Sequence, residues 1–293
     1  MNAVSSDVAS ALEIEARVVE QVRMARDTYR MRLRCPELAE RIVPGQFFMI
    51  RSTELSDPLL GRPFALYDTW SEDGIVAGVD FGYVVIGKMT SAMVGWSAGE
   101  PVRIWGPLGN GFPLPPPSPL PPSPSERLLM VAGGIGQTPF LAVGREALGR
   151  AVYGRPPRHI ERPYEYVALL YGARSREYLA GLDDFASAGI TTRVSTDDGS
   201  SGHHGLVTDL LEEELARRPP GVVYCCGPEP MMHAVASRCA AAGVACWLSL
   251  ESPMACGFGA CFSCVVKVKT DEGWDYRRSC VEGPVFRASD LEF

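Results

Sequence analysis

The chain has 293 residues, of which 46% are hydrophobic and 22% charged, and its formal net charge is −7. This is the composition of a soluble globular protein, long enough for two domains and a small third. The acidic balance argues against a nucleic-acid-binding surface, and no apolar run is long enough to span a bilayer. We therefore expect neither a nucleic-acid partner nor a membrane partner.

The first residues and the cysteine count predict a cytoplasmic location. Residues 1–16 are polar and acidic, without the apolar core of a signal peptide. The nine cysteines are an odd number in a chain without export features, which favours a reducing compartment.

Residues 1–112 carry the signals of short strands separated by turn residues, with no long helical period. This pattern predicts an antiparallel β-barrel. The expected strands are Val18–Met24, Thr28–Arg34, Gln46–Arg51, Gly78–Ile86 and Pro101–Trp105.

Two motifs in this region have the residue types of a cofactor site. In Gly61–Tyr67, an arginine beside a rigid proline can present its guanidinium to a phosphate, and the next residues can lay backbone amides along a flat ring. In Val85–Met93, a Gly-Lys-Met-Thr run opens a helical turn, whose free N–H groups can bind an anion. The alternatives are that Arg62 is an ordinary surface arginine and Thr90 a simple N-cap.

Two proline-containing segments interrupt the pattern. The run at 113–125 has too many prolines for a strand or a helix, so we expect an extended linker; a ligand for an SH3-type domain is the functional alternative. The stretch Tyr153–Pro163 mixes proline, glycine and arginine and predicts an excursion on the surface.

Residues 126–250 alternate short apolar runs with helical segments, which predicts a parallel sheet with right-handed crossovers and a nucleotide-binding role. The expected strands are Arg127–Ala132, Tyr166–Tyr171, Thr191–Thr196, Val222–Cys226 and Ala245–Leu250. The expected helices follow Pro139 as far as Arg150 and cover Arg176–Ala188, Val207–Arg217 and Pro230–Ala242.

Ligands bind at the carboxyl ends of the strands in such sheets. A glycine turn follows the first strand there, in the setting that cradles a pyrophosphate. The candidate residues for binding a dinucleotide at this edge are Gly133, Gly134, Gly136, Thr138, Asp197, Gly227 and Pro228.

The choice between NAD and NADP stays open from these residues. No acidic residue ends the second strand; Arg174 and Arg176 stand there and would suit the 2′-phosphate of NADP, or else are solvated charges. Asp197 and Asp198 would receive the ribose hydroxyls of NAD, or else only close a turn with Gly199.

Four cysteines near the C-terminus have the C-x4-C-x2-C…C spacing of a plant-type [2Fe–2S] site. The proposed metal ligands are Cys256, Cys261, Cys264 and Cys280. Gly257 and Gly259 let the loop curl around a cluster. Structural zinc is the alternative, but it more often shows two C-x2-C pairs or added histidines, and disulfides do not fit a reducing compartment. We expect a cluster module over 251–293 that moves single electrons.

The motif set resembles the ferredoxin reductase superfamily. Within it, a four-cysteine cluster after the nucleotide domain is similar to the electron-transfer subunit of class 1B dihydroorotate dehydrogenase. The resemblance extends from about Ile14 to Phe293. The motifs that carry it are Arg62–Ala65, Gly87–Thr90, Gly133–Gly136, Cys226–Pro228 and the four cysteines.

This resemblance implies an oxidoreductase with FAD on the barrel, NAD facing it and the cluster toward a partner. It assigns FAD binding to Arg62, Pro63, Phe64, Ala65, Gly82, Tyr83, Val84, Met89 and Thr90. It places Cys226 beside the nicotinamide as a catalytic residue. The chain departs from the family at Ala65, where a hydroxyl residue is usual, and at Val84, where arginine is frequent.

The implied partner is an FMN-containing dihydroorotate dehydrogenase catalytic subunit, in a two-plus-two heterotetramer of pyrimidine biosynthesis. The loop Met254–Phe262 is apolar, so its side chains are expected near the surface to dock that partner, or else to shield the cluster from water. Two other functions stay open. One is a diaphorase subunit of a soluble hydrogenase or of an NAD(P)H–ferredoxin transhydrogenase. The other is a non-enzymatic redox or zinc-sensing module, which only Ala65 and Val84 support.

Overall fold

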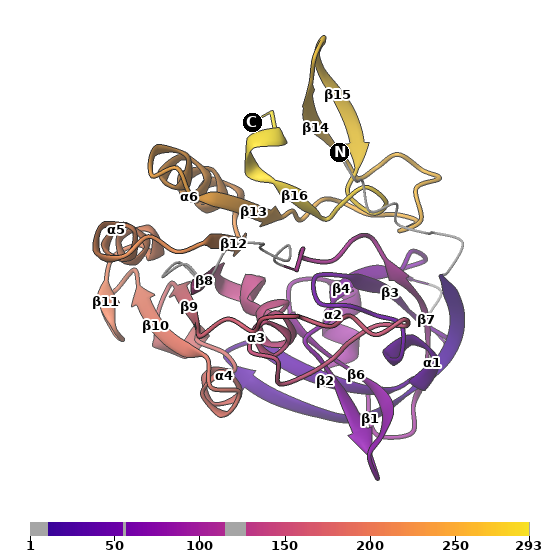
Figure 1. The fold of residues 1–293 in the computed structure, drawn as a ribbon. Helices are drawn as coiled ribbons and strands as arrows, with labels where there is room; N and C mark the ends of the chain where they lie inside the picture. The colour runs from indigo at the N-terminus through magenta and orange to yellow at the C-terminus, as the bar shows by residue number, and fades with distance from the viewer. Residues whose placement is uncertain (1–10, 55–56, 115–126, 293) are drawn as a thin grey trace.

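The computed structural model describes residues 11–54, 57–114 and 127–292. Within them the chain forms two seven-stranded sheets and one two-stranded hairpin, arranged as in Figure 1. No helix in these ranges has the length and apolar character needed to cross a membrane.

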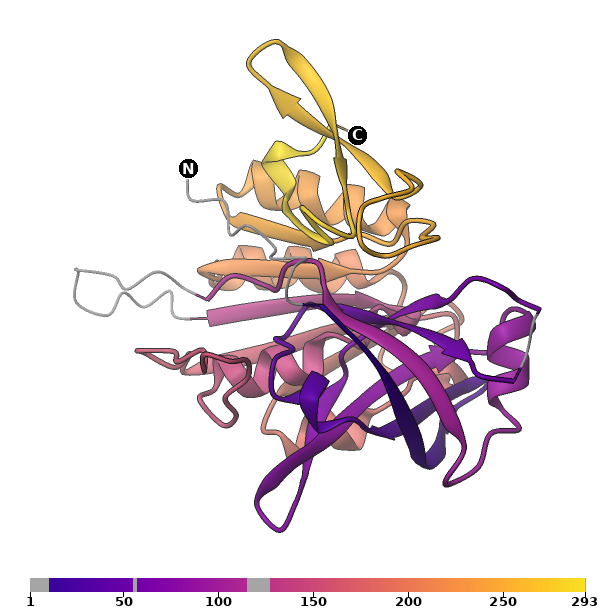
Figure 2. The ribbon, with the colours of Figure 1, turned by 90° about the vertical axis from the view of Figure 1, so that its right-hand side faces the viewer.

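The N-terminal sheet is antiparallel and curls into an open barrel, as predicted (Figure 2). Its strand order is β4-β3-β7-β1-β2-β6-β5. The strands are β1 Leu12–Ala25, β2 Thr28–Arg34, β3 Phe47–Ser52, β4 Arg62–Ala65, β5 Asp68–Glu72, β6 Ile75–Val84 and β7 Pro101–Leu108, with short helices α1 Pro36–Ala39 and α2 Lys88–Met93. Met31, Leu33, Val79 and Phe81 alternate along paired strands and fill its core, because successive strand residues face opposite sides.

The second sheet has the order β11-β10-β9-β8-β12-β13-β16 and is parallel except at β16, so the predicted parallel sheet is confirmed. The strands are β8 Arg127–Gly133, β9 Tyr166–Ala173, β10 Thr191–Thr196, β11 His203–His204, β12 Val222–Cys226, β13 Ala245–Ser249 and β16 Val285–Arg287. The helices are α3 Phe140–Ala147, α4 Leu182–Ser187, α5 Val207–Arg217 and α6 Glu229–Ala241, with 3₁₀ turns η2 Gly134–Gln137, η3 Arg176–Tyr178 and η4 Ala288–Asp290.

The C-terminal region contains a cysteine loop and then the hairpin of β14 Val265–Thr270 and β15 Gly273–Arg278, which stands clear of both sheets in Figures 1 and 2. The chain then returns as β16, which pairs with β13 and becomes the edge strand of the nucleotide sheet. The three-residue strand β16 therefore anchors the end of the cysteine module to the nucleotide domain, and Val266 and Val268 of β14 pack with Leu291 against the core of that domain.

One local prediction was wrong and another holds only in part. Tyr153–Pro163 is mostly exposed, as predicted, but Tyr153 is only 3% exposed and its hydroxyl donates to Asp68 of the barrel at 2.7 Å. The helix expected over Arg176–Ala188 is split into η3 and α4, because Gly181 takes a left-handed conformation with φ +73°. The predicted linker lies mostly outside the described residues, apart from 113–114.

Candidate functional site

The four C-terminal cysteines lie in two neighbouring pairs. The Sγ atoms of Cys264 and Cys280 are 3.2 Å apart and both residues are buried. Cys261 is exposed, and hydrogen bonds from Ser263 and then Cys256 lower the pKa of Cys261 to about 6. A [2Fe–2S] cluster takes two protein ligands on each iron, so this pairing fits the predicted cluster. Among the described residues, no three His, Cys, Asp or Glu side chains converge as ligands of a single metal ion.

The cysteine loop is held against the barrel by contacts that require glycine. Gly257 has φ +80°, and a Cβ there would lie 2.7 Å from Cγ of Met49 on β3. Trp105 of β7 donates from Nε1 to the carbonyl of Cys256 at 2.9 Å. On the other side, a Cβ at Gly259 would lie 2.6 Å from Val281. The barrel edge thus sets the position of the loop that carries the thiols.

The apolar side chains of this loop differ in exposure. Phe258 is 48% exposed and Phe262 62% exposed, so the expectation of surface positions is confirmed for them. Met254 is half-buried and packs with Met49 against the barrel. Arg278 lies 5.2 Å from the ring centre of Phe262 and bounds this apolar surface with a positive charge.

The turn after β8 and the turn after β12 touch at the carboxyl edge of the nucleotide sheet. A Cβ at Gly136 would lie 2.3 Å from the carbonyl oxygen of Cys226, and one at Gly133 would lie 2.7 Å from Cδ of Pro228. Gly134, by contrast, has φ +56°, and a Cβ added there would have no atom within 4 Å. The structure therefore brings the predicted glycine turn and Cys226–Pro228 together around an open backbone cradle, which fits a dinucleotide phosphate group.

Cys226 is a neutral thiol at this edge. Burial raises the pKa of Cys226 to about 12, the Glu251 carboxylate adds to the rise, and a hydrogen bond with Ser249 opposes it. Its neighbour Cys225 is 0% exposed in the hydrophobic core under the sheet. Burial raises the pKa of Cys225 far above its usual value, so this thiol has a packing role.

In the acidic turn after β10, one of the two carboxylates, that of Asp198, is hydrogen-bonded within the turn itself. The Asp198 carboxylate accepts hydrogen bonds from the Ser200 amide at 2.9 Å and the Ser200 hydroxyl at 2.6 Å, which lower the pKa of Asp198. Asp197 is exposed, and its amide donates to Ala173 at the end of β9. Arg174 and Arg176 are both exposed. Asp197 stays the predicted ribose-binding residue of this turn.

Thr138 and Gln137 close the glycine turn toward the barrel. A Cβ at Gly82 of β6 would lie 3.2 Å from Oγ1 of Thr138, so Gly82 allows the two domains to pack closely. Gln137 is 0% exposed, and neither atom of its side-chain amide has a hydrogen-bond partner among the described residues. We did not single out Gln137 from the sequence; a polar residue at a turn that packs against buried strands was the available signal.

The residues predicted to bind FAD divide by exposure. Arg62, Pro63, Ala65 and Val84 are half-buried along β4 and at the end of β6, where a ligand can reach them. The Arg62 guanidinium donates to the Leu60 carbonyl at 2.9 Å. This partly exposed strand edge beside a guanidinium fits the expected flavin, and the assignment stays a prediction.

The other predicted FAD residues are buried in protein. Phe64 packs on Phe81 with ring centres 4.8 Å apart, and Met89 is 2% exposed in the barrel core. Tyr83 stacks on Tyr29 and its hydroxyl donates to Gln21 at 2.5 Å. The Thr90 hydroxyl accepts from the amides of Ile86 and Gly87 at 3.0 and 3.1 Å. Thr90 is therefore the third residue of α2 and bonds back to the N-cap, which is Gly87, so the alternative that Thr90 is itself the N-cap is wrong.

Solved structures define the class of fold. The NADH-dependent reduced ferredoxin–NADP oxidoreductase aligns with a TM-score of 0.75 and 24% identity over 94% of this chain and 89% of that one. A ferredoxin NADP⁺ reductase from Neisseria gonorrhoeae aligns with a TM-score of 0.59 and 17% identity over 79% of this chain and 92% of that one. The chain has the ferredoxin reductase fold, with a cysteine module added after the nucleotide sheet.

Sequence comparison defines the family. Residues 251–292 match the iron–sulfur cluster binding domain of dihydroorotate dehydrogenase B, and residues 130–237 match the oxidoreductase NAD-binding domain. The dihydroorotate dehydrogenase B (NAD(+)) electron transfer subunits of Geobacillus kaustophilus and Desulforamulus reducens are 36% and 33% identical to the chain. These matches cover 94% and 93% of this chain and 96% and 95% of the two relatives. The chain belongs to the family of electron transfer subunits of dihydroorotate dehydrogenase B.

Proposed function

We propose that this chain passes electrons from a dihydroorotate-oxidising partner subunit to NAD. The observation that carries the proposal is the pairing of Cys264 with Cys280 and of Cys256 with Cys261 in a loop packed on the barrel edge. A [2Fe–2S] cluster, when bound, moves single electrons, and FAD, when bound, exchanges these with the hydride of NAD.

Each part of the chain has a defined task in this scheme. The four thiols hold the cluster, and the glycines of the loop place it against β3 and β7. Arg62 and the backbone along β4 hold the flavin, while the turn Gly133–Gly136 holds the pyrophosphate of NAD. Cys226 lies beside this turn as a neutral thiol, where it orients the nicotinamide without adding a negative charge.

The partner we propose is an FMN-containing catalytic subunit in a two-plus-two heterotetramer in the cytoplasm. Exposed aromatic side chains next to a redox centre favour a protein interface, and Phe258 and Phe262 supply them here. The family membership supports a subunit role, because its members are named as electron transfer subunits. On the same grounds we propose that the chain divides into an FAD-binding barrel over 1–112, a proline-rich linker over 113–125, an NAD-binding domain over 126–250 and a [2Fe–2S] module over 251–293.

The test compares the isolated chain with the chain plus its catalytic partner. We expect the isolated chain to reduce an artificial dye with NADH and to show no oxidation of dihydroorotate. Addition of the partner should give dihydroorotate-dependent reduction of NAD. Robust turnover of dihydroorotate by the isolated chain would refute the subunit function.

A further inference from the structure

The segment directly after β4 crosses from one domain to the other. Tyr67 lies two residues beyond Ala65, yet its ring is 1% exposed and packs in the hydrophobic core of the nucleotide domain with Phe140 and Phe185. In exchange, Ala142 of α3 and Tyr153 pack in the core of the barrel. The two domains thus exchange side chains at this point.

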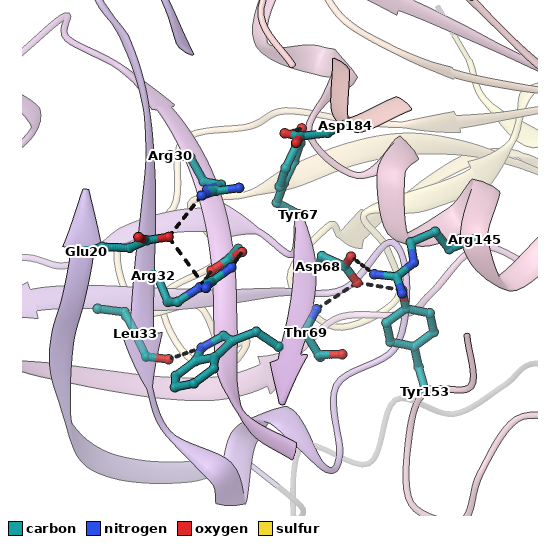
Figure 3. Close-up of polar contacts among 12 residues, drawn as sticks. Glu20, Arg30, Arg32, Leu33, Tyr67, Asp68, Thr69, Arg145, Tyr153 and Asp184 are labelled. Carbon is teal, nitrogen blue, oxygen red and sulfur yellow. Dashed lines mark hydrogen bonds and ion pairs between the residues drawn. The ribbon is translucent and has the colours of Figure 1, made fainter. Parts of the chain in front are cut away.

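Hydrogen bonds fix Tyr67 on both sides. Its amide donates to the Asp80 carbonyl on β6 at 2.8 Å, and its carbonyl accepts from the Ala142 amide at 3.1 Å. Its hydroxyl donates to Oδ2 of Asp184 on α4 at 2.7 Å, and Figure 3 shows this side chain pointing at Asp184. Burial and the Asp184 carboxylate raise the pKa of Tyr67, so that the hydroxyl stays a neutral donor.

The next residue extends the same junction. The Asp68 carboxylate pairs with Arg145 of α3 and accepts from the hydroxyl of Tyr153 at 2.7 Å and from the amide of Thr69 at 2.8 Å (Figure 3). Together, Tyr67 and Asp68 bind α3 and α4, and α3 begins three residues after the glycine turn η2. The junction therefore connects the predicted flavin strand to the predicted NAD turn over a very short length of chain.

We propose that Tyr67 is a positioning residue for hydride transfer, and that its bond to Asp184 fixes the distance between flavin and nicotinamide. The inference rests on the proposed function. Hydride transfer requires the reacting atoms at about 3–3.5 Å, and a displacement of about 1 Å can cost a hundredfold in rate. A hydroxyl that joins the two halves of the site is well placed to control this distance. The bond to Asp184 is specific to the contact between domains, whereas the ring contributes ordinary packing.

The experiment uses Tyr67→Phe, which keeps the ring and removes the hydroxyl. We expect the rate of flavin reduction at saturating NADH to fall about tenfold, with FAD content unchanged and the apparent affinity for NADH changed less than twofold. Amide hydrogen exchange over 140–147 and 182–187 should become faster, while exchange in β2 and β6 stays as it was. Tyr224→Phe is the control, because it also removes the hydroxyl of a buried tyrosine, one that donates to Pro113 instead of joining the segment after β4 to α4.

A double-mutant cycle with Asp184→Ala isolates the bond. If the bond acts as proposed, each single variant and the double variant reduce flavin at the same lowered rate. Additive losses, a normal rate in Tyr67→Phe, or an equal loss in Tyr224→Phe would each overturn the positioning role while leaving the proposed function intact. Failure of NADH to reduce flavin in the unmodified protein would overturn both.

Discussion

The barrel has two contact surfaces with the rest of the chain, and they differ in chemistry. Toward the nucleotide domain the contact combines apolar packing with buried hydroxyls and a carboxylate at Tyr67 and Asp68. Toward the cysteine loop it is mainly apolar and tight, with Gly257 against Met49 and Leu108 and one hydrogen bond from Trp105 to the Cys256 carbonyl. Polar contacts fix direction and distance, whereas a glycine contact fixes how closely two backbones approach. The first surface should therefore respond to removal of single polar atoms, and the second to added volume.

The largest expected effect comes from removing one thiol of the cysteine loop, which tests whether this loop and the flavin and NAD sites act separately. We expect Cys261→Ser to abolish or destabilise the cluster and to lower electron transfer with the partner more than a hundredfold, because the thiolate is the iron ligand. FAD binding and NADH-dependent dye reduction should survive, since the thiol lies outside both sheets. Iron analysis and the visible spectrum measure this outcome. Loss of FAD from a folded Cys261→Ser variant would contradict the separation of the two sites.

At the carboxyl edge of the nucleotide sheet, the smaller change Cys226→Ala should slow hydride transfer about tenfold, equal to roughly 1.4 kcal/mol of activation free energy. The melting temperature should change little, because this half-buried thiol supplies limited packing. Cys225→Ala is the matched control: it should lower stability without slowing the chemistry, since Cys225 is fully buried in the core. Stopped-flow reduction of flavin by NADH gives the rates. Unchanged kinetics in Cys226→Ala would contradict its placement beside the nicotinamide.

Two glycines with the same φ of +80°, Gly257 and Gly74, allow the effect of added volume at the apolar surface to be distinguished from the effect of backbone strain. Gly257→Ala adds a Cβ 2.7 Å from Met49, whereas Gly74→Ala adds one in open space. Both variants should lose about 1 kcal/mol because an L-residue disfavours this conformation, and Gly257→Ala should lose about 1–3 kcal/mol more from overpacking. Thermal unfolding and iron retention measure the difference. Equal effects of the two substitutions would show that the contact with Met49 is unimportant.

The last expected effect is a pH dependence of stability near the polar surface, with no change in the chemistry. Burial raises the pKa of Glu146 to about 7, although Arg158 bonds both carboxylate oxygens at 2.8 and 3.1 Å. A carboxyl whose folded pKa exceeds its unfolded value stabilises the fold fully below the unfolded pKa of about 4.5, and this contribution is lost as the pH rises through about 7. Glu146→Gln should therefore flatten the stability curve between these values, by up to about 3 kcal/mol for a shift from about 4.5 to about 7. Parallel curves for the two proteins would contradict the raised pKa.

Short-range patterns in the sequence determined much of this protein. The C-x4-C-x2-C…C spacing identified the cysteine module, and the family match over 251–292 agrees with it. Apolar runs located β8, β9, β12 and β13, because a strand buried on both faces is continuously apolar. The strand β10, with the sequence TTRVST, was expected instead from the alternation of strand and helix segments. Short strand-like runs separated by turn residues likewise located β1, β2, β3, β6 and β7 of the barrel. These features depend on residues close together in the chain, so one sequence reveals them.

The contacts between domains were decided only by the tertiary structure. Tyr67, Asp68 and Tyr153 are polar or aromatic residues without periodicity, and their burial depends on partners such as Asp184, which lies 117 residues away from Tyr67. The strand β16 was also missed, since three residues become a strand only when β13 offers a free edge. Side chains such as Met89 and Thr90 look the same in sequence whether they face a ligand or the core. Such features arise from long-range packing, which local propensity and spacing do not encode.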